Sequence, residues 1–280
     1  LVSATIWAGW SVLVRYSVTS SLSPFDLAAL RFGVASLIFL PMVLRRHVVL
    51  PRPGRGLFLS LTAGTPYVVI AGFGYAHTTV ARGSTIGPAV MAIVATLLGL
   101  WLLRERLTAQ RGLGIALSFA GLAAIAGGGL FAPATSALGD MLIVAAAVLW
   151  GLYTVGSRAW AVPSMAGAAA VSLWSAALYL PIYILFIEQR IWTAPLGEVV
   201  LQALYQGVAT GILALWTYNR SVALLGAARG SLFACLVPVL AAAGAVPVLG
   251  EWPTAADLAG MALTVVGVMI GSGVIRIGGR

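Results

Sequence analysis

The segment LLRERLTAQRGLG, at residues 102–114, has a partial copy in LGEWPTAADLAG, at residues 249–260. In both, a glutamate is followed by a threonine and then by a glycine at the same spacing, and the string ARGS precedes both, at 81–84 and 228–231. Shared residues in a fixed order across two distant segments are typical of a tandem duplication. The matched positions are Glu105 and Glu251, Thr108 and Thr254, Gly114 and Gly260, and Gly121 and Gly267.

Further matches extend the duplication toward the N-terminal end of each half. They are Trp10 with Trp150, the pair Leu40-Pro41 with Leu180-Pro181, and Tyr75 with Tyr218. We therefore expect two homologous halves, residues 1–132 and 133–280.

Composition indicates the medium in which these halves fold. The chain of 280 residues is 61% hydrophobic and only 8% charged, more apolar surface than a water-soluble domain can bury. Apolar runs of about 20 residues, separated by short polar breaks, have the length of transmembrane helices rather than of barrel strands. The sequence predicts an all-α integral membrane protein with ten transmembrane helices. The expected spans are residues 2–19, 24–44, 56–79, 82–103, 108–129, 138–160, 165–187, 197–224, 228–249 and 254–275.

The charge distribution predicts the orientation of these spans. Five helices per half is an odd number, so the second half enters the membrane from the opposite side, and such inverted repeats are typical of carriers. With the N-terminus inside, twelve of the 16 arginines fall at cytoplasmic ends and only Arg82 and Arg190 at outer ends. This positive-inside bias places both termini in the cytoplasm of a multi-pass protein of the cell membrane. The twelve are Arg45, Arg46, Arg52, Arg55, Arg104, Arg106, Arg111, Arg158, Arg220, Arg229, Arg276 and Arg280.

Several other functions are disfavoured. The net charge of +9 follows from membrane topology rather than from nucleic-acid binding. Cys235 is the only cysteine, which excludes a disulfide framework and a cysteine metal site. The sequence has no HExxH, GxSxG or P-loop motif of an enzyme, and a channel would favour a symmetric oligomer with rings of charge. We expect a monomer or weak homodimer in the lipid bilayer that binds a small-molecule substrate without cofactor, metal or nucleic acid.

The two five-helix halves, each with Glu-x-x-Thr before a glycine-bearing fifth helix, resemble the drug/metabolite transporter superfamily, specifically its ten-helix EamA-type members. The resemblance covers nearly the whole chain, and the Trp and Tyr content is similar to the branch that exports aromatic and other neutral amino acids. It implies a central cavity between the halves, alternating access and export of small metabolites. We expect a carrier that exports small neutral or zwitterionic solutes, most of all amino acids including aromatic ones, with hydrophobic drugs or cations as the alternative.

Aromatic and polar side chains within the spans are the candidates for the substrate site. Trp7/Trp10 and Trp150/Tyr153 are i,i+3 pairs on equivalent helices, so we expect them to face one another across the two-fold axis. Bundle packing is the alternative for any single residue, but indole and phenol groups in mid-membrane need partners, which a cavity supplies. A membrane-embedded arginine must snorkel, pair or face water. The full set is Trp7, Trp10, Arg31, Tyr75, His77, Trp150, Tyr153, Trp174, Trp216, Tyr218 and Asn219.

The carboxylates suggest how transport is driven. All seven Asp and Glu residues fall at the ends of predicted helices, whereas proton- and sodium-driven carriers usually bind their ion within the membrane. We therefore expect facilitated diffusion. His77, an imidazole near the outer end of the third span, leaves proton antiport as the alternative.

Glycine and threonine positions predict local packing in the fifth and tenth spans. Gly114 with Gly121, and Gly260 with Gly267, each lie on one helix face, where small residues let another helix approach closely. Thr254 with Asp257 predicts a capping box at the start of the tenth span.

Overall fold

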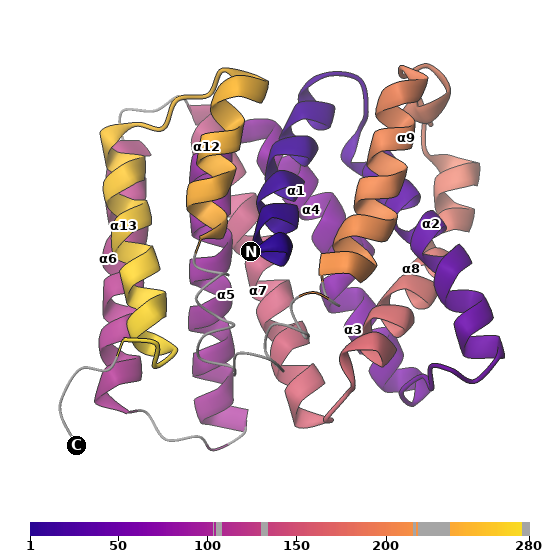
Figure 1. Ribbon diagram of the computed structural model, residues 1–280, viewed down its shortest axis with the longest axis horizontal. Helices are drawn as coiled ribbons and strands as arrows, with labels where there is room; N and C mark the ends of the chain where they lie inside the picture. Colours follow the sequence, from indigo (N-terminus) through magenta and orange to yellow (C-terminus); the bar gives the residue numbers. More distant parts are fainter. Residues whose placement is uncertain (103, 105–107, 130–133, 215–216, 218–235, 276–280) are drawn as a thin grey trace.

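The computed structural model describes residues 1–102, 104, 108–129, 134–214, 217 and 236–275. Its helices stand side by side and run mostly in the same up-and-down direction (Figure 1). They are α1 (Val2–Thr19), α2 (Pro24–Leu44), α3 (Pro53–Ala63), α4 (Thr65–His77), α5 (Val80–Leu102), α6 (Ala109–Gly129), α7 (Ala134–Ala159), α8 (Ser164–Phe186), the short turn η1 (Arg190–Trp192), α9 (Leu196–Leu204), the π-helix η2 (Tyr205–Leu213), α12 (Val237–Leu249) and α13 (Ala255–Gly271).

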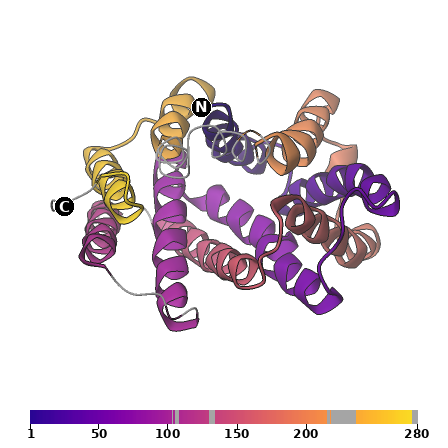
Figure 2. The same cartoon turned by 60° about the horizontal axis from the view of Figure 1, so that its bottom comes forward.

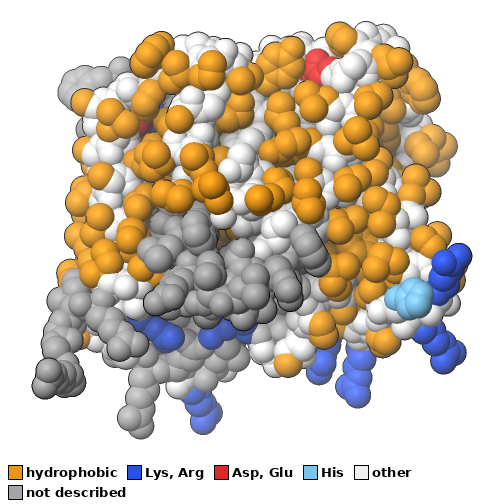
Figure 3. All heavy atoms as spheres, in the orientation of Figure 1, with side chains coloured by type: hydrophobic (Ala, Val, Ile, Leu, Met, Phe, Trp, Pro, Cys, Tyr) orange, Lys and Arg blue, Asp and Glu red, His pale blue; other side chains and the backbone are white. Residues whose placement is uncertain are grey.

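The described part of the chain contains seven helical segments long and apolar enough to cross a membrane, together with shorter apolar helices at α12 and α13. Apolar side chains cover most of the face in Figure 3, and arginine side chains gather along its lower edge. Apolar flanks with charge at one end are what a bilayer requires of a helical bundle. The all-helical membrane architecture predicted from composition is therefore confirmed.

The predicted third span, 56–79, is not one continuous helix. It begins as α3, stops at Gly64 and resumes as α4. Gly64 has φ −90° and ψ −137°, and Pro66 occupies the first turn of α4, where its missing N–H costs nothing. A Cβ atom at Gly64 would lie 2.1 Å from the hydroxyl of Ser175 in α8. This close contact, invisible in the local sequence, requires a glycine at the break.

The predicted eighth span, 197–224, also departs from a regular helix. It begins as α9 and continues as η2, whose i→i+5 hydrogen bonds make a wider turn. Gln202, Gln206 and Thr210 are buried along this segment. Most of the remainder of the span lies outside the described residues.

The glycine stripes pack α6 directly against α13. A Cβ atom at Gly114 would come within 2.5 Å of the Cα of Gly271, and one at Gly121 within 2.7 Å of the carbonyl oxygen of Gly260. Backbone therefore touches backbone, as small-residue stripes permit. The predicted packing role is confirmed, and the contact lies within the bundle. In Figure 2, α5 stands between this pair and the other helices.

Side-chain caps fix several helix starts. The predicted capping box of Thr254 and Asp257 is present at α13, and Ser23 with Asp26 forms a second one at α2. The Thr108 hydroxyl accepts a hydrogen bond from the Arg111 N–H at 3.2 Å at the start of α6. In each case a side-chain oxygen pairs with a backbone donor that the helix leaves free.

Candidate functional site

Five aromatic side chains from α1, α4 and α7 form one continuous aromatic cluster. Trp10 stacks on Tyr67, with ring centroids 6.1 Å apart, and meets Tyr75 edge-on at 5.7 Å. Tyr67 contacts Trp150 at 4.7 Å, and Trp150 contacts Tyr153 at 5.3 Å. These separations are those of favourable aromatic pairs. Of the predicted pairs, Trp10 and Trp150 are thus brought together, with Tyr67 between them.

A chain of polar groups borders the aromatic cluster on the side of η2. The Trp10 indole N–H donates to the Oε1 atom of Gln206 at 2.9 Å. The Gln206 amide donates to Gln202 at 3.2 Å, and Gln202 donates to the hydroxyl of Ser17 at 2.9 Å. Both glutamine side chains are fully buried. Because buried amides must be hydrogen-bonded, this network fixes the orientation of the Trp10 ring.

Arg31 of α2 lies at the end of this polar chain. Its Nη1 atom is 3.5 Å from the same Gln206 oxygen that Trp10 contacts, and its guanidinium lies 5.9 Å from the Phe32 ring. No carboxylate lies within ion-pair distance of Arg31 among the described residues. A partly buried cation without an anion is costly in a membrane, so this position favours an anionic group on a ligand.

Other predicted site residues lie apart from the aromatic cluster. Trp7 packs with apolar side chains of α1, α5 and α12, including Val80 and Val237. Trp174 lies against Gly56 of α3, where a Cβ atom would come within 2.7 Å of the indole nitrogen. His77 ends α4, and no interaction described for it reaches the cluster. Trp216, Tyr218 and Asn219 lie outside the described residues.

Three neighbours of the site were missed by the sequence interpretation: Tyr67, Gln202 and Gln206. The glutamines carried a signal, since they stand four residues apart in a mostly apolar span, and polar amides in a membrane need partners. No sequence signal pointed to Tyr67, because the break at Gly64 determines which side of α4 faces α1 and α7.

The cavities among the described helices include two of about 250 and 300 Å³, and neither of these is lined by the aromatic cluster. The first lies between α5, α6 and α13. The second is lined by residues of α5, α6 and α7, including Asp140. The central cavity expected between the halves therefore stays a prediction.

Arg82, in the first turn of α5, belongs to a buried ion-pair group. Arg82 is 6% exposed, and its guanidinium makes a bidentate ion pair with Asp140 of α7. It also lies 3.7 Å from a carboxylate oxygen of Asp257 in α13 and donates to the carbonyl oxygen of Ile125 at 3.1 Å. Local sequence could not show this pairing, because the group draws on four separate helices.

A second ion pair joins α1 to the connection between α12 and α13. The Arg15 guanidinium contacts Glu251 at 2.8 Å and the carbonyl oxygen of Tyr75 at 2.7 Å. Glu251 also accepts the backbone N–H of Val80 at 2.8 Å. Arg15 is therefore explained by pairing rather than by snorkelling to the headgroups.

Comparison with known proteins agrees with this architecture. YyaM, an uncharacterised transporter of Bacillus subtilis, is 27% identical over 95% of this chain and 89% of its own. A probable terminal-alkyne amino-acid exporter of Streptantibioticus cattleyicolor is 27% identical over 89% of this chain and 82% of its own. An uncharacterised transporter of Archaeoglobus fulgidus is 29% identical, over 55% of this chain and only 54% of its own length. A protein crystal structure with 25% identity superposes with a TM-score of 0.61, covering 96% of each chain.

A helical bundle with these apolar spans, similar over most of its length to transporters, defines a multi-pass membrane transporter and not an enzyme. The chain belongs to the EamA-like transporter family of the drug/metabolite transporter superfamily, whose sequence pattern matches residues 1–127 and again residues 137–272.

Proposed function

We propose that this transporter exports small neutral or zwitterionic metabolites from the cell, above all amino acids including aromatic ones, by alternating access. One observation carries the proposal: the aromatic cluster ends in the Trp10–Gln206–Arg31 contact. An apolar ring system can stack on Tyr67 and Trp150, while a carboxylate meets Arg31 at the other end. The Streptantibioticus cattleyicolor relative, named as an amino-acid exporter, supports the same class of solute.

Hydrophobic cations are the weaker alternative. Arg31 lies beside the aromatic cluster, and no described carboxylate neutralises it. A cationic solute would be repelled there, because like charges at close range in a low-dielectric site raise the free energy. A phosphorylated solute would want several cationic side chains. Of the two described arginines beside the cluster, Arg15 is already paired with Glu251, which leaves Arg31.

The proposal includes ten transmembrane helices in two inverted halves, residues 1–132 and 133–280, with both termini in the cytoplasm of a cell-membrane protein. Three observations support it. The family pattern matches twice. α1 packs on α12 as its counterpart α7 packs on α5, and α2 packs on η2 as α8 packs on α3. Reporter fusions after Arg52 and after Arg280 test the topology, since an external signal from either would contradict it.

We expect Trp150→Ala to lower kcat/KM for an aromatic amino acid by about tenfold in proteoliposomes. An aromatic contact contributes about 0.5–1.5 kcal/mol beyond its buried area, and about 1.4 kcal/mol corresponds to a factor of ten. Trp101→Ala is the matched control, because Trp101 on α5 is 76% exposed. Equal transport by both variants, for every accepted solute, would refute stacking on Trp150.

The role of Arg31 is tested by a solute pair rather than by one rate. Arg31→Gln should raise KM for an amino acid by roughly 10- to 100-fold, since a hydrogen bond to a charged group contributes about 1.5–3 kcal/mol. KM for the amine that lacks the same carboxylate should change little. Arg52→Gln, at an exposed arginine before α3, controls for surface charge. If amino acid and amine lose affinity equally, Arg31 does not bind the carboxylate.

We also propose facilitated diffusion as the mode of transport. Two of the membrane carboxylates, Asp140 and Asp257, are already paired with Arg82, which leaves them poorly suited to carry an exchangeable ion. Proteoliposomes with equal pH on both sides and no membrane potential should therefore equilibrate solute, and His77→Ala should behave as the wild type does. Accumulation against the solute gradient driven by a pH gradient alone, and abolished in His77→Ala, would favour antiport instead.

A further inference from the structure

Gln206 is held between α1 and α2 by the residues on either side of it. The Tyr205 hydroxyl donates to the carbonyl oxygen of Ile6 in α1 at 2.8 Å. On the other side, a Cβ atom at Gly207 would lie 2.6 Å from the Cβ atom of Val34, so η2 packs directly on α2 at this point. The place of the Gln206 side chain is therefore fixed by contacts of its two neighbours with both helices.

Hydrogen bonding determines the orientation of the Gln206 amide. Its Oε1 atom accepts from the indole N–H of Trp10 at 2.9 Å and lies 3.5 Å from the Nη1 atom of Arg31. Indole and guanidinium groups are donors only, so they require the oxygen on their side. The amide nitrogen faces the other way and donates to the Oε1 atom of Gln202 at 3.2 Å. Position 206 thus presents an acceptor to the aromatic cluster.

Gln206 contacts Arg31 without neutralising it. An amide oxygen carries no net charge, and its distance of 3.5 Å from Nη1 exceeds the about 2.7–2.9 Å of a charge-assisted hydrogen bond. Gln206 is fully buried, whereas Arg31 is partly exposed. Because a guanidinium is a planar fork of N–H donors that matches a carboxylate, Arg31 can still bind a carboxylate on its exposed side.

We infer, building on the proposed export of amino acids, that Gln206 determines the selectivity of the site for solutes with a carboxylate. Its neutral amide orients Trp10 and Arg31 and leaves the positive charge of Arg31 to the solute. A carboxylate at position 206 would itself form an ion pair with Arg31 and would compete with the solute for the same donors. Glutamine and glutamate have nearly the same shape, so the choice between them here is one of charge.

Gln206→Glu tests the charge in proteoliposomes, with an aromatic amino acid and the amine that lacks its carboxylate as the two solutes. KM for the amino acid should rise by about tenfold or more, because the new side chain occupies the guanidinium. KM for the amine should not rise, since the variant keeps the acceptor toward Trp10 and cancels the charge that repels a cation. Gln189→Glu is the matched control. The Gln189 amide oxygen also accepts an indole N–H, from Trp192 at 2.7 Å, but at an exposed turn, and this variant should transport both solutes as the wild type does.

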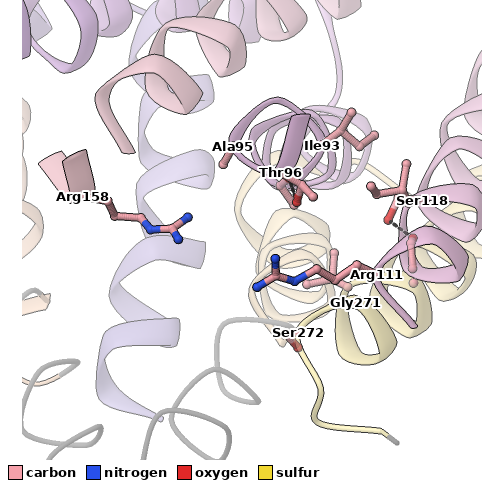
Figure 4. A pocket seen from close by; sticks show the side chains of 13 residues that line it. Ile93, Ala95, Thr96, Arg111, Ser118, Arg158, Gly271 and Ser272 are labelled. Atoms are coloured by element: carbon pink, nitrogen blue, oxygen red, sulfur yellow. Dashed lines mark hydrogen bonds between the residues drawn. The ribbon is translucent and has the colours of Figure 1, made fainter. Parts of the chain in front are cut away.

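Gln206→Met tests the positioning role. The variant removes the oxygen, so Trp10 and Arg31 lose their common acceptor while Arg31 keeps its charge. KM should rise by about two- to tenfold for both solutes, the range for a neutral hydrogen bond, and the preference for the amino acid should remain. Thr96→Val is the control, because it removes a hydroxyl that lines the cavity shown in Figure 4, between α5, α6 and α13. It should leave both KM values unchanged.

The outcomes separate the role of Gln206 from the proposed function. If the wild type accepts solutes with a carboxylate and Gln206→Glu keeps the wild-type ratio of the two KM values, Gln206 does not determine the selectivity. Gln206→Met decides independently if the charged variant fails to fold. Wild-type KM values in Gln206→Met, or a lost preference for the amino acid, would each overturn the role of Gln206. A wild type that accepts amines and no solute with a carboxylate would instead contradict the proposed function, and this role with it.

Discussion

Arg82→Leu is expected to destabilise the folded protein by about 3–5 kcal/mol, the usual cost of removing one partner from a buried ion pair. Arg82 holds the carboxylates of Asp140 and Asp257 and the carbonyl oxygen of Ile125. Without it, two largely buried carboxylates lose their cation. The variant should lose most of its monodisperse fraction in detergent, or melt far below the wild type by size-exclusion thermal assay.

The companion variants identify the cause. Arg82→Leu combined with Asp140→Asn and Asp257→Asn removes the uncompensated charge and should recover part of the lost stability, because neutral groups cost less to bury than ions. Arg52→Leu, at an exposed position, should melt with the wild type. A melting temperature of Arg82→Leu equal to that of Arg52→Leu would mean that the ion-pair group contributes nothing to the fold.

The second large effect is expected at the contact between α6 and α13. Gly114→Leu places a side chain where a single Cβ atom already comes within 2.6 Å of the carbonyl oxygen of Gly267. The obstacle is backbone, so no rotamer change can relieve it, and the helices must separate. Overpacking commonly costs about 1–3 kcal/mol, and separating the two helices also removes the other contacts between them.

Gly112→Leu is the matched control, since Gly112 lies on the same helix and a Cβ atom there would meet no other part of the described chain within 4 Å. Thermal melting of both variants in the same detergent measures the difference. Comparable stability would show that α6 and α13 do not depend on close backbone contact.

Features set by local chemistry were the predictable part of this molecule. The capping box at Thr254, the glycine stripes and the apolar length of the helices each follow from residues close together in sequence. Contacts that depend on the direction in which a side chain points from its helix were harder to predict. Trp7 and Trp10 share a broad helix face, but at about 100° per residue they point about 60° apart, enough for Trp7 to join the apolar packing with α12 and for Trp10 to join the aromatic cluster.

The ion-pair group around Arg82 shows the other limit of the sequence. Its charges all fall near helix ends, where topology and helix dipoles already explain them, so their pattern did not indicate burial. Only the arrangement of α5, α7 and α13 brings these ends together. The glutamine pair in α9 and η2 is the opposite case, because two amides in an apolar span could have been recognised as a polar face.

The π-helix η2 affects how the proposed solute site can diverge among relatives. Its wide turn holds one residue more than an α-helical turn needs. If one residue were deleted from η2, the wide turn would become an ordinary α-helical turn. The side chains before and after it would then keep pointing in the same directions. The same deletion in α8 would rotate everything beyond it by about 100°. Next to Trp10, therefore, the chain can lose a residue, and with it one polar group of the proposed site, without unpacking the bundle.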